Sequence, residues 1–303
     1  MFNKIIEEIC KELDIKYTYL SNKWIIKLET NNKTKFISGY KFDLNNHGIG
    51  LVLDDKNAFY ETLRSMNIPA CVHSILFREN NNNDYAKKCH TKEDIINYFN
   101  KYNKDVVIKP NMGSLGDGVY HITNKEDLLE KTSKLLIDNF SISICPFYKI
   151  KNEYRIIILD NKVKLIFKKE KSKIIGDGKS SIKDLLIKLN KYYFKNIDLP
   201  NTILKKNEEY IYDWRFNLSK GSIASINIDN KLKEKLSKIA LEVTNKLNIR
   251  FTSVDIIELD NNELLVLEAN SGVSIDKVIN FIPNGYNIAK EIYKEAIIKM
   301  IKD

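Results

Sequence analysis

Helix-like and strand-like spacings of hydrophobic residues alternate along the whole chain, and this mixture constrains the fold more than any other feature. Helical spacing occurs at 2–13, 56–66, 91–103, 125–138, 181–193, 231–247 and 286–302. Short strand-like runs occupy 24–29, 34–38, 72–77, 105–109, 119–122, 141–145, 154–160, 162–167, 223–228, 251–258 and 263–268. The pattern predicts an α+β (mixed α/β) fold, with no internal repeat and no uninterrupted β-α-β-α series.

Local turn and cap residues support several of these elements. Asp160-Asn161 and Asp260-Asn261 each separate two adjacent strand-like runs. Because Asp and Asn adopt tight turns readily, both places predict antiparallel hairpins. Thr91 and Asn124 each precede a helical run and are followed three residues later by Asp, which predicts two helix N-caps.

The composition limits the class of protein. The 303 residues, with 43% hydrophobic and 29% charged side chains, are typical of a globular chain with a sizeable core. The net charge of +9 is scattered and depends on lysine, with only five arginines. We therefore expect no nucleic-acid-binding surface, which would gather its basic residues in a patch.

We also expect a cytoplasmic protein without a membrane segment. No apolar run approaches the roughly 18 residues that span a bilayer. The start of the chain mixes acids and lysines, which does not fit a signal peptide. The four cysteines are far apart and form no C-x-x-C, so we interpret them as reduced, mostly buried thiols.

The first segment whose residues could bind a ligand or carry out chemistry is DVVIKPNMGSLGDGVYHI at 105–122. A strand ends at Lys109, and a loop with Gly113, Gly116 and Gly118 follows. Glycines let backbone N–H groups approach phosphate oxygens, and a lysine beside them supplies a positive charge. On its own the segment fits an ordinary glycine-rich hairpin equally well. It matches neither a P-loop nor a dinucleotide-binding fingerprint.

The second segment is TSVDIIELDNNELLVLEANSG at 252–272. Glu268 and Asn270 are two residues apart on a strand and so project from one face. A four-residue loop at 260–263 would place Asp255 opposite Glu268. Hard oxygen ligands of this kind suit Mg²⁺. The alternative is an exposed hairpin with solvated acids.

Two further segments carry arginines. In CPFYKIKNEYRIIILDNKVKLIFKKEK, at 145–171, Glu153 and Arg155 share one strand face, and Lys168 with Lys169 ends the next strand. One lysine of that pair could face a ligand, although a surface hairpin with ion pairs fits the same residues. In WRFNLSKGSIA, at 214–224, Arg215 and Asn217 precede a turn.

These segments, in this order, resemble the ATP-grasp superfamily over about residues 50–303. VVIKP with the glycine loop is similar to the strand and loop that cover the phosphates, and LVLEANSG to the E-x-N metal motif. RFNLSKG resembles a segment of RimK-type glutamate ligases, and IIGDGKSSIKDLL resembles a segment of cyanophycin synthetases. The chain departs from the family at Cys145, where members often have Glu.

The resemblance implies a fold in which two α+β subdomains clasp ATP. We expect a short N-terminal region at 1–53, a lid subdomain at 54–146 and a C-terminal subdomain with the metal site at 147–303. The implied roles are as follows: Lys56, Lys109, Gly113, Ser114, Gly116, Gly118 and Lys168 at the phosphates, Phe147 and Tyr148 at the adenine, Glu153 at the ribose, Asn217 near the nucleotide, Asp255, Glu268 and Asn270 at Mg²⁺, and Arg155 and Arg215 as catalytic charges.

The implied activity is that of an ATP-dependent carboxylate–amine ligase that forms an amide or peptide bond through an acylphosphate. The substrates would be small molecules, amino acids or peptides, and a homodimer is an expectation from the family alone. The alternative within the same fold is a nucleotide-dependent kinase or a regulatory ATP binder. No Ser, Cys or His nucleophile is required, because phosphoryl transfer depends mainly on positioning and charge neutralisation.

Overall fold

The computed structural model describes residues 1–30, 32–78, 91–113, 116–190, 194 and 198–302. Contacts divide the chain into two compact units, with residues 1–168 and 226–303 in unit 1 and residues 169–225 in unit 2. Both units mix helices and strands, which confirms the predicted α+β fold. The subdomain boundaries at 53/54 and 146/147 stay a prediction.

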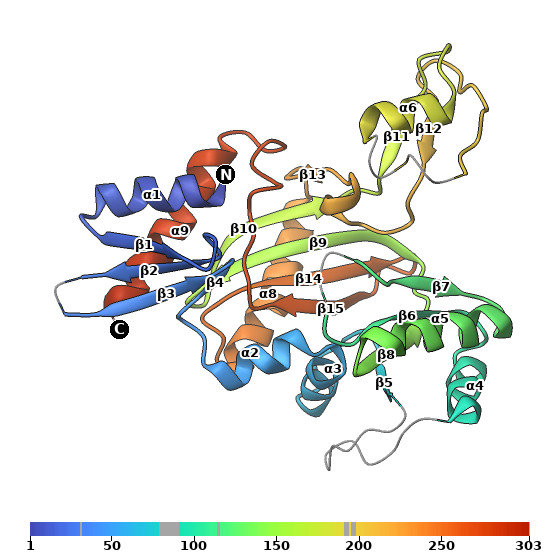
Figure 1. Cartoon of the computed structure of the whole chain (residues 1–303), viewed down its shortest axis with the longest axis horizontal. Coiled ribbons are helices and arrows are strands. Elements are labelled where there is room, and N and C mark those ends of the chain that lie inside the picture. The colour runs from blue at the N-terminus through green and yellow to red at the C-terminus, as the bar shows by residue number, and fades with distance from the viewer. Residues whose placement is uncertain (31, 79–90, 114–115, 191–193, 195–197, 303) are drawn as a thin grey trace. The chain divides into compact units, whose positions relative to one another are not determined.

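The first layer of unit 1 is an antiparallel sheet near the N-terminus, backed by helices α1 (Phe2–Glu12) and α9 (Gly285–Lys302) (Figure 1). The strands lie in the order β1 (Lys16–Leu20), β2 (Ile25–Glu29), β3 (Thr34–Ser38) and β4 (Lys41–Phe42). Buried side chains of α1, such as Ile5 and Ile9, recur at helical spacing and form the contact face of that helix. The first and last parts of the chain thus fold together.

The central sheet of unit 1 contains the segment 252–272, which carries the predicted metal ligands. Its neighbouring strands are, in order, β10 (Lys162–Lys169), β9 (Ile150–Leu159), β14 (Phe251–Leu259) and β15 (Leu264–Asn270). Helix α8 (Asn230–Leu247) packs on β9 and β14, while α2 (His47–Asp54) and α3 (Lys56–Ser65) pack on β15 (Figure 1). Ile156, Val254 and Leu236 are fully buried between these elements. The buried core therefore fixes the positions of β9, β14 and β15.

A second antiparallel sheet carries the predicted phosphate lysine. Its strand order is β5 (Ser74–Phe77), β8 (Ser141–Pro146), β6 (Val106–Pro110) and β7 (Tyr120–Ile122). Helix α5 (Lys125–Asp138) covers this sheet and contacts α4 (Lys92–Lys101). Ile108, Ile144 and Leu76 are buried beneath these helices. Since side chains alternate across a strand, Lys109 projects from the opposite face to Ile108.

Unit 2 is small and has a core of its own. It contains β11 (Lys173–Ile175), α6 (Ile182–Leu189), β12 (Glu209–Ile211), the 3₁₀ turn η2 (Leu218–Lys220) and the short strand β13 (Ala224–Ser225). Strands β11 and β12 pair antiparallel, and Ile174, Ile182, Leu186, Phe194 and Leu204 form the buried cluster. A helix was predicted to continue to 193, but α6 ends at Leu189. A strand was predicted over 223–228, but only Ala224–Ser225 pairs.

The predicted caps and turns are confirmed. Thr91 forms a capping box with Asp94 at α4, and the Asn124 side chain accepts a hydrogen bond from the N–H of Asp127 at α5. Asp160 and Asn161 both have positive φ, at 43° and 58°. This is the backbone of the two-residue hairpin turn that joins strands with the natural twist. The run ENNNND at 79–84 predicts an exposed loop, and these residues lie outside the described ranges.

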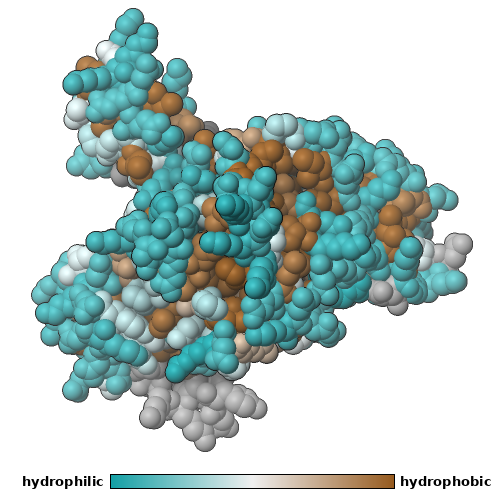
Figure 2. All heavy atoms as spheres, turned by 180° about the vertical axis from the view of Figure 1, so that it is seen from behind, coloured by the Kyte–Doolittle hydropathy of each residue, from teal (hydrophilic) through white to brown (hydrophobic). Residues whose placement is uncertain are grey.

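Hydrophilic residues cover most of the face seen in Figure 2, with hydrophobic residues exposed between them in smaller areas. Cys10, Cys71 and Cys145 are buried and unpaired thiols, as predicted for these three. None of the helices in the described ranges is long and apolar enough to cross a bilayer.

Candidate functional site

The β14–β15 hairpin brings the three predicted metal ligands together. Asp255 lies opposite Glu268, and Ser253 lies opposite Asn270, as the four-residue loop predicted. The register shifts directly after Asp255 because Leu267 has no partner on β14. Asn270 Nδ2 lies 3.5 Å from Glu268 Oε1. Two carboxylates and an amide therefore lie at the same end of the hairpin.

Asp255 is also paired with one of the predicted catalytic arginines. Arg155 lies opposite Asp255 on the neighbouring strand β9. Arg155 Nε and Nη2 donate to the two Asp255 oxygens at 2.7 Å and 2.6 Å, and Asp255 is 0% exposed. Burial alone would lower the pKa of Arg155, but the Asp255 carboxylate offsets this effect and holds the pKa above its usual value. The guanidinium therefore stays charged and neutralises Asp255.

Lys56 connects the start of α3 with the glycine loop. Its Nζ donates to the carbonyl oxygens of Gly113, at 2.9 Å, and Asn111, at 3.3 Å. Burial lowers the pKa of Lys56, the Glu268 carboxylate opposes the shift, and the Lys109 ammonium adds to it. The Glu268 carboxylate and the Lys109 ammonium thus both affect the charge of Lys56. That the three residues form one phosphate and metal site stays a prediction.

The rest of the predicted phosphate loop is described only in part. Ser114 lies outside the described residues. Gly116 and Gly118 have positive φ of 71° and 66°, a conformation that glycine adopts at little cost. A Cβ at Gly118 would also press on Pro110 and Leu135. The loop geometry therefore requires glycine at position 118.

The residues predicted at the base and ribose lie around a small apolar cluster. Cys71, Ile257 and Leu265 form its buried part, and Tyr148 packs against it. The Tyr148 hydroxyl oxygen accepts from the N–H of Val72 at 2.9 Å. Glu153 is buried on β9, opposite Ile257. A flat apolar ring could pack on this cluster, with Glu153 beside it.

The backbone around Phe147 and Tyr148 was predicted to bind the adenine, and this stays a prediction. The N–H of Phe147 donates to the Asp105 carbonyl oxygen at 2.9 Å. The Phe147 ring stacks on His121 with 3.8 Å between the ring centres. Phe147 therefore joins the end of β8 to the start of β6. At the end of β10, Lys168 is half-buried and Lys169 is buried.

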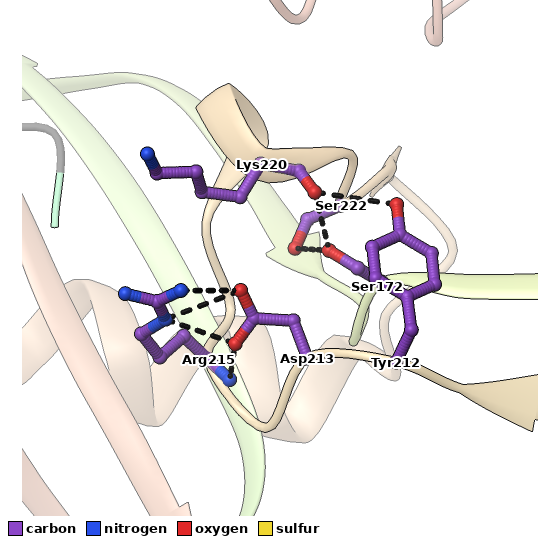
Figure 3. A network of polar contacts seen from close by, with 6 residues as sticks. All are labelled: Ser172, Tyr212, Asp213, Arg215, Lys220 and Ser222. Carbon is purple, nitrogen blue, oxygen red and sulfur yellow. Dashed lines mark hydrogen bonds and ion pairs between the residues drawn. The ribbon is translucent and has the colours of Figure 1, made fainter. Parts of the chain in front are cut away.

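Arg215 lies in unit 2, within the network of polar contacts in Figure 3, and Asn217 belongs to the same unit. Asp213 accepts from Arg215 Nη2 at 2.7 Å and from Arg215 Nε at 2.9 Å. The carbonyl oxygen of Asn217 accepts from the N–H groups of Lys220 and Ser222. The network fixes the turn that carries the RFNLSKG motif. The roles of Arg215 and Asn217 at the nucleotide site stay predictions.

The donor chemistry of the hairpin fits a Mg²⁺ ion. Glu268 offers a half-buried carboxylate, Asn270 an amide oxygen, and Asp255 a carboxylate whose oxygens keep lone pairs beyond those used by Arg155. No group of three His, Cys, Asp or Glu side chains fit to hold a metal occurs among the described residues. Two carboxylates plus nucleotide phosphates would complete the shell of such an ion.

Sequence reasoning missed a polar contact beside these ligands. Asp54, at the end of α2, accepts from Ser271 Oγ at 2.8 Å and from Lys41 Nζ at 2.5 Å. Lys41 and Ser271 lie far from Asp54 in the sequence, so no local pattern indicated this contact. Two buried nitrogens, His73 Nε2 and Asn111 Nδ2, have no partner within the described parts.

Comparisons with known proteins agree with this architecture. Residues 201–296 match the RimK-like ATP-grasp domain. The chain is 24% identical over 275 residues to the glutathione biosynthesis bifunctional protein GshAB of Clostridium perfringens (strain 13 / Type A), which covers 82% of this chain and 33% of that protein. The chain thus spans about a third or less of the curated relatives that it matches.

Solved structures show the same fold at low identity. D-alanine–D-alanine ligase of Bacillus anthracis has a TM-score of 0.54 and 17% identity, over 83% of this chain and 67% of that one. A RiPP-associated ATP-grasp ligase of Chryseobacterium gregarium, in complex with ADP and a leader and core peptide, has a TM-score of 0.52 and 16% identity, over 98% of this chain and 92% of that one. These matches show that the chain has the ATP-grasp fold and that its residues 201–296 resemble a RimK-like ATP-grasp domain.

Proposed function

We propose that the protein is an ATP-dependent carboxylate–amine ligase that works through an acylphosphate. The observation that carries the proposal is the β14–β15 hairpin, which brings Asp255, Glu268 and Asn270 to one end, while Lys56 at the start of α3 contacts the Gly113 carbonyl oxygen of the glycine loop. Opposite charges in this arrangement suit a triphosphate and its metal ion. The two solved structures described above are ligases by name, and their activity comes to this chain only as part of the proposal.

In the proposed first step, a carboxylate oxygen of the acid attacks the γ-phosphorus of ATP. The bond from that phosphorus to the bridging oxygen breaks and ADP leaves. Lys56 and Lys109 bind the phosphates, while Asp255, Glu268 and Asn270 hold Mg²⁺, which when bound neutralises charge on the phosphates. In the second step an amine attacks the acyl carbon and loses a proton, and inorganic phosphate leaves.

The remaining predicted residues have supporting roles in the proposal. The apolar cluster beside Tyr148 and Glu153 takes the base and ribose. The backbone at Gly113, Gly116 and Gly118 covers the phosphates and excludes water, which would otherwise hydrolyse the acylphosphate. Arg155 neutralises the buried Asp255 carboxylate. The acceptor is an amino acid or a peptide.

The test uses Glu268→Gln, with Glu263→Gln as a matched control in the turn of the same hairpin. ADP and phosphate release is measured with panels of acids and amines, and products are identified by mass. Loss of one preorganised charge typically lowers turnover about 10²–10³-fold, so we expect at least that loss for Glu268→Gln and normal turnover for Glu263→Gln. Both variants should fold, because each keeps its size and neither side chain is fully buried.

The measured products also separate the alternative. A phosphorylated product with ADP but without free phosphate would indicate a kinase. Nucleotide binding without any turnover would indicate a regulatory binder. Wild-type turnover by Glu268→Gln would show that the metal site is assigned to the wrong residues.

A further inference from the structure

The N-terminal sheet reaches the candidate site through the turn between β3 and β4. The carbonyl oxygen of Tyr40 accepts from the N–H of Val273 at 3.0 Å. The Lys41 Cγ lies 3.5 Å from the position that a Cβ would have at Gly272. The stem of Lys41 therefore lies across the chain two residues after Asn270.

The head of Lys41 lies in a small polar group beside the metal ligands. Asp54 accepts from Lys41 Nζ with one carboxylate oxygen and from Ser271 Oγ with the other. Ser271 is buried and follows Asn270 directly. An ammonium and a hydroxyl thus bind the two oxygens of a single carboxylate, which is an arrangement that recognises carboxylates in general.

The exposure of this group allows exchange with solutes. The Lys41 and Asp54 side chains are 51% and 32% exposed, so Lys41 can be reached from solvent. Exposed ion pairs contribute little to stability, and a dissolved carboxylate can therefore displace Asp54 from Lys41 at low cost. Two other cations of the site are engaged elsewhere. Arg155 is paired with the buried Asp255 carboxylate, and Lys56 contacts the glycine loop.

We propose that Lys41 binds a carboxylate of the acid substrate that does not react. This carboxylate replaces Asp54 as the partner of the Lys41 ammonium. This inference rests on the proposed ligase function and gives its substrate class: an acid with two carboxylates, of which one is phosphorylated and the other is held by Lys41. The reacting carboxylate must lie at the γ-phosphate, and pairing it with an ammonium would weaken it as a nucleophile. The N-terminal region then selects the acid.

The test traps the acylphosphate of the full-length protein with hydroxylamine, which gives a hydroxamate. Succinate, l-glutamate and l-aspartate are compared with acetate and 4-aminobutyrate. The variants are Lys41→Ala, Lys41→Arg and Asp54→Asn, which keeps an oxygen for Ser271 but removes the competing charge. Lys27→Ala is the control, because Lys27 forms an ion pair of 2.8 Å with Glu29 within β2 of the same sheet.

We expect Lys41→Ala to raise the KM of the dicarboxylic acids by about tenfold or more, as loss of a charged contact does, while the KM of ATP stays within about twofold. Lys41→Arg should recover most of the affinity, and Asp54→Asn should lower the KM of the acid below the wild-type value. If the Lys41–Asp54 ion pair had a structural role only, Asp54→Asn would not lower the KM of the acid.

Three results would overturn the proposal. Unchanged KM values for the acids in Lys41→Ala and Asp54→Asn, with equal losses of thermal stability, would make the pair a structural contact only. Hydroxamate from the monocarboxylic acids alone would reject the substrate class and leave the ligase function standing. No hydroxamate from any acid, with no ADP release, would reject both.

Discussion

Lys56 is the residue at which local electrostatics bear most directly on the proposed binding of phosphates. It begins α3, donates to the Gly113 carbonyl oxygen and lies within electrostatic reach of Lys109 and Glu268. Its pKa is lowered first by burial and further by Lys109, while Glu268, Asp55 and Asp54 raise it. A half-buried ammonium that is affected by a second cation is costly unless an anion joins them, and phosphates are such an anion.

This environment predicts a pH dependence of nucleotide binding. Because the pKa of Lys56 lies below the usual 10.5, its ammonium loses the proton at lower pH than an exposed lysine does. The charged form attracts phosphates, so the affinity for a non-hydrolysable ATP analogue should fall as pH rises through that lowered pKa. Calorimetric titrations at a series of pH values should show this fall in the wild type and a flat profile in Lys56→Met.

Lys92→Met is the control, because Lys92 begins α4 as Lys56 begins α3 and is exposed. It should keep the wild-type profile. An identical pH profile in Lys56→Met and the wild type would mean that Lys56 does not touch the phosphates.

Residue types could be predicted from the sequence, but their pairing could not. Glu268 and Asn270 were found by their spacing of two, and Asp255 by the length of the turn. The ion pair between Arg155 and Asp255 joins residues 100 positions apart and depends on which strand lies beside β14. No local pattern specifies that neighbour, so Arg155 was predicted only as a free catalytic charge.

Among the elements, those with strong local chemistry were predicted well. The hairpin β14–β15 has turn formers at 260–262 and apolar strands. The pairing of Asp255 with Glu268 also depends on the register shift at Leu267, which the loop length does not specify. Helix α2 was missed because two glycines, Gly48 and Gly50, lower its intrinsic helix propensity. Strands β11 and β12 are three residues each and exist through their pairing with one another, which a short window of sequence does not contain.

The turn that carries Arg215 and Asn217 depends on a glycine. Gly221 has φ of +100°, and a Cβ there would overlap the Tyr212 hydroxyl. That hydroxyl and Ser172 Oγ both donate to the Lys220 carbonyl oxygen at 3.2 Å (Figure 3). A side chain at position 221 would therefore strain the backbone and displace Tyr212.

We expect Gly221→Ala to lower the local opening free energy of the turn by about 1–3 kcal/mol, the usual cost of such backbone strain. Hydrogen exchange of peptides over 209–225 measures it. Gly178→Ala is the control, since Gly178 has φ of +78° but its nearest neighbours lie 3.5 Å from a built Cβ. Equal hydrogen-exchange protection of 209–225 in Gly221→Ala and Gly178→Ala would contradict the claim that a side chain at position 221 displaces Tyr212.

For the whole molecule, the sequence predicted the superfamily but not the arrangement of unit 1. Residues 1–42 and 273–302 fold together, as Phe2 N–H donates to Asp276 Oδ2 across 274 positions. The sequence alone gave no role to the N-terminal region, because its contact with Ser271 through Lys41 and Asp54 forms only in the folded chain. The separate core of unit 2 was not predicted either: the helix at 181–193 was expected, but the short strands β11 and β12 that complete the core with it were not.

The central claim is that Lys109 and Glu268 hold opposite ends of one nucleotide–metal ligand. Calorimetric titration of a non-hydrolysable ATP analogue, with and without Mg²⁺, tests it on the wild type, Lys109→Ala, Glu268→Gln and the double variant. We predict that Mg²⁺ strengthens binding to the wild type, that each variant weakens it, and that the double variant loses less than the sum of the single losses. Binding that ignores Mg²⁺, or wild-type affinity in both single variants, would contradict the account.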